Sequence, residues 1–356
     1  MKAVQRQELW AGLVRSGIVT GDLPDDAGDT SPWYVRAMVG VAAWIAALFL
    51  LVSVGIGLVE LMKSPVATAI AGLVICAAAI VLMRANPAGI FATQLALAAS
   101  LAGQSLVAYA LLQNAERLEV APWLWLSAFE VALVVVAPNY LHRVLATLAA
   151  ATALYVALVT LGWGALFPAL AAAAFVLVQG NEAGLAPRTS FWQPVATGLA
   201  FAALAATGGA MFDASEFAFW GNHRVNPLLP WTGFATVAVV WLATVGKLLR
   251  NANSPVSSRL ALWAWLAALA LVAAAWPISG LAVILIVMLI AFAAGNVVIV
   301  GFAILAMLAA LGHYYYSLQT TLLVKSGAML ATGVVLLLSR HFLRSLAVPA
   351  EEPGHA

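Results

Sequence analysis

The sequence predicts an all-α fold, a polytopic transmembrane helical bundle of about 12 spans. Hydrophobic residues make up 64% of its 356 residues, and charged residues only 8%. Its mean hydropathy is +1.02. A water-soluble fold of this length needs more charge, because its surface must be wetted. The apolar runs are mostly about 17–25 residues long, the length of a helix that crosses the roughly 30 Å hydrocarbon layer.

Each apolar run is expected to be a helix, since a helix satisfies its own backbone hydrogen bonds in lipid. Membrane β-strands are excluded, because they would show alternation over about ten residues instead of continuous apolar runs. The predicted spans are residues 36–59, 66–83, 89–112, 122–137, 144–161, 164–179, 191–212, 229–246, 260–276, 278–294, 297–311 and 319–340.

The basic residues predict the orientation of the bundle, because Lys and Arg in short loops favour the cytoplasmic side. With twelve spans and the N-terminus inside, 12 of the 16 basic residues face the cytoplasm and 4 face outward. Both termini are therefore expected in the cytoplasm. The inner residues are Lys2, Arg6, Arg15, Arg36, Arg84, Arg143, Arg188, Lys247, Arg250, Arg259, Arg340 and Arg344. The outer residues are Lys63, Arg117, Arg224 and Lys325.

Three segments are expected along the chain. Residues 1–34 form a cytoplasmic amphipathic helix followed by an acidic linker, residues 35–345 form the transmembrane bundle, and residues 346–356 form a disordered cytoplasmic tail. The amphipathic helix either docks a cytoplasmic partner or lies on the membrane surface or on the bundle's inner face.

Several function classes find no support in the sequence. The net charge is only +2, and the basic residues form no stripe along the sequence. Nucleic-acid binding is therefore not expected. The single Cys76 cannot form an intrachain disulfide, and no Cys/His spacing indicates a metal site. No cofactor motif is present. An intramembrane enzyme is disfavoured, because the five histidines are scattered without a second catalytic group at fixed spacing. They are His142, His223, His313, His341 and His355.

Two ionisable residues inside apolar runs are candidates for function, because charge in the hydrocarbon layer is costly. Glu130 lies near the middle of its span and must either hold its proton or pair with a cation. Lys325 lies about six residues, or roughly 9 Å, into the last predicted span. Their similar depths suggest that Glu130 and Lys325 face each other. The alternatives are a neutral Glu130 hydrogen-bonded to a neighbouring helix and a Lys325 that snorkels to the interface.

Other polar residues in the apolar runs are candidates for lining a substrate path. Ser100 and Gln104 are four residues apart and share a helix face. The alternative is that they join helices by hydrogen bonds. Asn296, with Gly295, is expected to form a tight turn between two spans. The full candidate set is Gln94, Ser100, Gln104, Tyr315, Tyr316 and Asn296.

Three motifs resemble a known family. They are Pro32-Trp-Tyr-Val-Arg36, Ala102-Gly-Gln104, and Phe292-Ala-Ala-Gly-Asn296 followed by Gly312-His-Tyr-Tyr-Tyr-Ser-Leu-Gln-Thr-Thr-Leu-Leu-Val-Lys325-Ser326. The pattern is similar to the bacterial membrane family called domain of unknown function 4401. The resemblance implies a multi-pass protein of the bacterial inner membrane, with a small membrane protein as a partner. It implies no reaction.

Two functions follow as hypotheses. The first is a transporter or channel for an apolar or lipid-like substrate, because few polar residues are available to line a hydrophilic path. The alternative is a non-enzymatic subunit or assembly factor of a cell-envelope membrane complex. Membrane lipids are expected partners in either case.

Overall fold

The computed structural model describes most of the bundle. Its first predicted span, 36–59, is described only at scattered positions, and the last, 319–340, lies almost entirely outside the described residues. The continuous described stretches are residues 63–85, 90–113, 119–181, 188–211, 229–251, 259–275 and 280–317.

The described residues form helices and no β-strand, which confirms the all-α prediction. Each helix overlaps one predicted apolar run. The helices are α3 (Pro65–Ala85), α4 (Ile90–Leu112), α5 (Ala121–Val136), α6 (Tyr140–Thr160), the 3-10 turn η2 (Gly164–Leu166), α7 (Phe167–Gln179), α9 (Thr189–Met211), α10 (Leu229–Asn251), α11 (Arg259–Ala275), α12 (Leu281–Ala293) and α13 (Val297–Ser317).

Five of the described helices are long and apolar enough to cross a membrane, namely α3, α4, α6, α10 and α13. Among the shorter apolar helices, α7 and α12 have 13 residues each. At 1.5 Å per residue they extend about 20 Å, which is less than the roughly 30 Å of a hydrocarbon layer. The total of about 12 spans and the orientation stay predictions.

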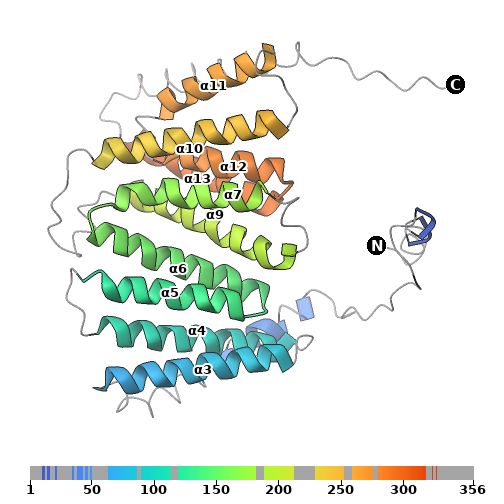
Figure 1. Cartoon of the computed structure of the whole chain (residues 1–356), viewed down its shortest axis with the longest axis vertical. Coiled ribbons are helices and arrows are strands. Elements are labelled where there is room, and N and C mark those ends of the chain that lie inside the picture. The colour runs from blue at the N-terminus through green and yellow to red at the C-terminus, as the bar shows by residue number, and fades with distance from the viewer. Residues whose placement is uncertain are drawn as a thin grey trace.

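The helices lie side by side in a long row, from α3 at one edge to α11 at the other (Figure 1). Helices that follow each other in sequence pack together in the pairs α3–α4, α5–α6 and α12–α13. Helix α6 also packs against α9, which joins the α3–α6 group to the helices that follow.

Two glycines let α3 and α4 approach closely. A Cβ atom on Gly103 would lie 2.7 Å from the carbonyl oxygen of Gly72 and 2.6 Å from Sγ of Cys76. A Cβ atom on Gly72 would lie 2.7 Å from the carbonyl oxygen of Gly103. Small residues at such crossings allow backbone-to-backbone van der Waals contact, which stabilises helix pairs in lipid.

Helices α5 and α6 form a hairpin whose connected ends make hydrogen bonds to side chains. Asn139 is the N-cap of α6, and its side-chain oxygen accepts a backbone N–H of the first turn at 3.0 Å. The last carbonyls of a helix lack partners within it. Here Arg84 of α3 donates to the carbonyl of Val136 at 2.9 Å, and Arg143 of α6 donates to that of Val134 at 3.2 Å.

The largest buried hydrophobic cluster joins α7, α9 and α12. Phe175 of α7 and Ile284 and Ile286 of α12 are fully buried. Helix α12 contains no polar residue at all, as expected for a helix in a bundle core or in a membrane. Fully buried alanines of α9, such as Ala200 and Ala203, let these helices pack closely.

Candidate functional site

A cleft of about 570 Å³ lies at the end of the bundle where α7 and α12 stop. It is formed by the first turn of α6, the end of α7, α9, and the turn that connects α12 to α13. The N-terminal parts of α9 and α13 complete its lining. The polar lining residues are Tyr140, Gln179, Gln193, Thr197 and Asn296. The main apolar ones are Leu141, Val144, Phe201, Val297, Val298 and Ile299.

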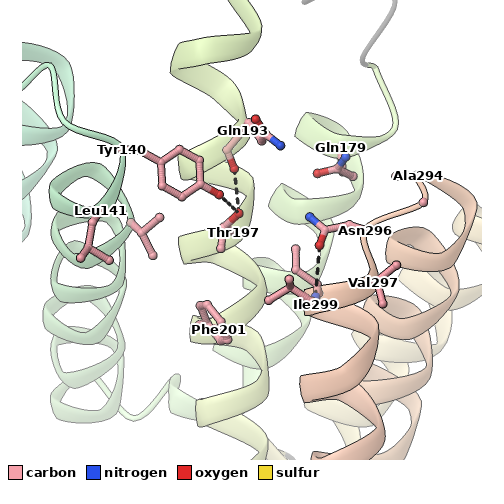
Figure 2. A pocket seen from close by; sticks show the side chains of 13 residues that line it. Tyr140, Leu141, Gln179, Gln193, Thr197, Phe201, Ala294, Asn296, Val297 and Ile299 are labelled. Carbon is pink, nitrogen blue, oxygen red and sulfur yellow. Dashed lines mark hydrogen bonds between the residues drawn. The ribbon is translucent and has the colours of Figure 1, made fainter. Parts of the chain in front are cut away.

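One wall of the cleft joins α6 to α9. The hydroxyls of Tyr140 and Thr197 are 3.0 Å apart, and the Thr197 hydroxyl also lies 2.9 Å from the carbonyl oxygen of Gln193 (Figure 2). Thr197 is buried, whereas Tyr140 and Gln193 are exposed at the cleft mouth. Deeper in the same wall, Phe201 packs edge-on against Phe302 of α13, with ring centroids 4.9 Å apart.

The opposite wall is the turn from α12 into α13. Gly295 adopts φ +69°, in the left-handed region that favours glycine. The N–H of Gly295 donates to the carbonyl of Phe292, and the N–H of Asn296 donates to the carbonyl of Ala291. This pair of hydrogen bonds is the Schellman motif that ends α12. Asn296 then caps α13, since its Oδ1 accepts the N–H of Ile299 at 3.2 Å. The tight turn expected at Gly295-Asn296 is thereby confirmed.

The end of α7 supplies Gln179, which is buried beside this turn (Figure 2). Just after it, Asn181 accepts a hydrogen bond at 3.0 Å from Nζ of Lys247 on α10. A cation at a helix C-terminus is favourable, because it faces the negative end of the helix dipole. Lys247 therefore stabilises the end of α7 at the edge of the cleft.

A second cluster of polar side chains lies between helices α3, α4 and α6. Nε2 of His142 is 2.7 Å from the Ser100 hydroxyl and 3.2 Å from the side-chain nitrogen of Gln104. All three residues are buried, and His142 is fully so. The Cys76 thiol of α3 donates to the Ser100 carbonyl at 3.5 Å. These contacts are the interhelical hydrogen bonds that formed one alternative for Ser100 and Gln104.

The remaining sequence candidates are dispersed. Glu130 is buried in α5, only 2% exposed, but Lys325 lies outside the described residues, so their pairing stays a prediction. Gln94 is half-buried on α4. Tyr315 and Tyr316 stack edge-on at the last turn of α13, about 30 Å along that helix from Asn296. Their roles in lining a path stay predictions.

Sequence reasoning missed His142, Tyr140, Gln193 and Thr197. The first two were placed before a span expected to start at residue 144, whereas α6 begins at Tyr140. Asn139, a good N-cap residue directly after a proline, was the signal for the earlier start. Gln193 and Thr197 are four residues apart on α9, but nothing in the sequence relates them to the distant Asn296.

The described helices fit a membrane-embedded protein with a cleft at one end of its bundle. The model of the family described as "Domain of unknown function (DUF4401)" matches residues 32–346. The chain belongs to this family, as the three motifs had indicated. Searches among curated proteins and among solved structures found no match.

Proposed function

We propose that this protein binds and transports an amphipathic, lipid-like molecule, and that the cleft is its binding site. The cleft is the observation that supports the proposal. Its volume of about 570 Å³ falls within the range of small-molecule pockets. It also has hydrogen-bonding groups beside aliphatic ones, as a ligand with a polar head and an apolar chain requires.

The lining favours a ligand whose polar part is uncharged. The polar groups of the described lining are hydroxyls and amides, and none of these residues is charged. Hydroxyls and amides both donate and accept hydrogen bonds, so they suit a glycerol or sugar head. Leu141, Val297 and Val298 offer exposed apolar surface for the chain of such a molecule.

The proposed location is the cytoplasmic side of a bacterial inner membrane. The predicted orientation puts the ends of α7 and α12 on that side, together with Arg84, Arg143 and Lys247. The ends of these helices would lie where the hydrocarbon layer of the membrane meets the headgroup region. An amphipathic molecule can therefore enter the cleft directly from the inner leaflet.

A flux assay tests the proposal. The protein is reconstituted in vesicles of phosphatidylethanolamine and phosphatidylglycerol with NBD-labelled monoacylglycerol, and dithionite quenching reports transfer between leaflets. Thr197→Val removes the hydroxyl that joins Tyr140 to α9 but keeps the side-chain shape. The loss of one hydrogen bond predicts a flux lower by about fivefold.

The matched control is Thr236→Val. Thr236 is half-buried on α10, away from the residues that line the cleft, and its hydroxyl donates to the carbonyl of Thr232 in the same helix. Its flux should equal that of the wild type. No protein-dependent flux in the wild type, or equal flux in both variants, would refute the proposal.

Native mass spectrometry of gently extracted protein distinguishes the alternative of a subunit or assembly factor. A lone chain that retains a stoichiometric lipid supports transport. A second polypeptide retained without lipid supports the subunit hypothesis instead.

A further inference from the structure

The α3–α6 helices enclose a group of polar side chains that the cleft does not use. Ser100 and Gln104 of α4 hold Nε2 of His142, at 2.7 and 3.2 Å, and Cys76 of α3 contacts the Ser100 carbonyl. Glu130 of α5 lies within electrostatic range of the Cys76 thiol. Cys76 also packs in one hydrophobic cluster with Leu133 and Val134, one helical turn from Glu130.

Two atoms in this group are buried without a hydrogen-bond partner in the described part of the chain. They are Oε2 of Glu130 and Nδ1 of His142. The side chains are 2% and 0% exposed. Buried polar atoms in folded proteins almost always have partners, so two unpartnered atoms in one group indicate a function.

A metal ion does not fit this group, because no three His, Cys, Asp or Glu side chains among the described residues come close enough to hold one. A proton does fit. A carboxyl group enclosed by apolar helices is stable only when neutral, unless a cation joins it. The imidazole of His142 is a second group that can bind a proton, because its Nδ1 has no hydrogen-bond partner among the described residues.

We propose that Glu130 and His142 form an internal proton-binding site, and that α6 couples its state to the cleft. The coupling rests on the proposed function. The first residues of α6 connect the two sites. His142 contacts Ser100 of α4, while Tyr140 and Val144 line the cleft. A change of charge at His142 would shift its contacts with Ser100 and so alter the turn that forms one cleft wall.

The other described charged and titratable side chains near this site have contacts of their own. From α3, Cys76 contacts the Ser100 carbonyl, and Arg84 is directed to the carbonyl of Val136 at the end of α5. From α6, Arg143 is directed to backbone carbonyls of α5 and α9. None of these described cations pairs with Glu130.

Carbodiimide labelling of the full-length protein in lipid nanodiscs tests the proton site. Dicyclohexylcarbodiimide reacts with protonated carboxyl groups in apolar surroundings, and peptide mass spectrometry locates the product. At neutral pH Glu130 should be labelled and the exposed Glu119 should not. Glu130→Gln should abolish the labelling, with Cys76 still protected from maleimide as evidence of folding.

The coupling is tested in the same samples by adding monoacylglycerol. Linked sites usually change each other's affinity by about fivefold or more. The labelling rate of Glu130 should therefore change by at least that factor, and His142→Gln should remove the change. His142→Gln keeps a polar side chain for Ser100 but cannot take up a proton.

The outcomes test the proton site, its coupling to the cleft and the proposed function separately. If Glu130 is not labelled at neutral pH, the proton site is refuted. If it is labelled, and monoacylglycerol binds without changing the rate, the coupling is refuted and the site stands. If Glu130 is labelled but monoacylglycerol does not bind at all, the proposed function fails, and the coupling fails with it.

Discussion

The close crossing of α3 and α4 predicts that Gly103→Ala destabilises the protein. The added Cβ atom would lie 2.7 Å from the carbonyl oxygen of Gly72, whereas ordinary contact begins at 3.4 Å. The helices must therefore separate by about 0.7 Å at this point, because neither backbone can rotate away. The movement would also stretch the contact between Cys76 and Ser100.

Gly301→Ala in α13 is the matched control. Gly301 is also inside a helix, but a Cβ atom there would meet nothing within 4 Å. The gain in helix propensity, about 0.5–1 kcal/mol, is shared by both variants and cancels between them. Their difference isolates the cost of overpacking, which is about 1–3 kcal/mol.

The assay is unfolding by SDS in mixed micelles, followed through alkylation of Cys76. Cys76 is the only cysteine in the chain, and it is 3% exposed at the crossing itself. Gly103→Ala should lower the free energy of unfolding relative to Gly301→Ala and speed the labelling. Equal stability of the two variants would refute the close approach of α3 and α4.

Two further predictions use the same unfolding assay. Ser100→Ala removes the 2.7 Å partner of His142 and should cost about 1–2 kcal/mol. Ser105→Ala, at an exposed serine of α4 that bonds within its own helix, should cost less than about 0.5 kcal/mol; equal costs would contradict the buried network. Asn296→Ala removes the cap on the Ile299 N–H and should cost about 1 kcal/mol, whereas Asn296→Ser should retain most of the stability because serine also caps. No difference between the last two would argue against the cap.

The candidate site was only partly predictable from sequence, and particular residues show why. Ser100 and Gln104 were paired correctly, because their spacing of four depends only on the helix period. The tight turn at Asn296 followed from Gly295 and from the apolar runs on either side. His142, in contrast, lies outside every span predicted from the sequence, and its partners on α4 are about forty positions away. Such contacts depend on which helix faces which.

The sequence by itself determined the helical class of the protein and the approximate position of each described helix of the bundle. Hydrocarbon accepts only segments that satisfy their own backbone, so apolar run length leaves little choice. Only the tertiary structure decided that α7 and α12 end at the same level and open the cleft. Packing between apolar helices in lipid depends on side-chain shape rather than polarity, and shape complementarity between distant segments is not written in their composition.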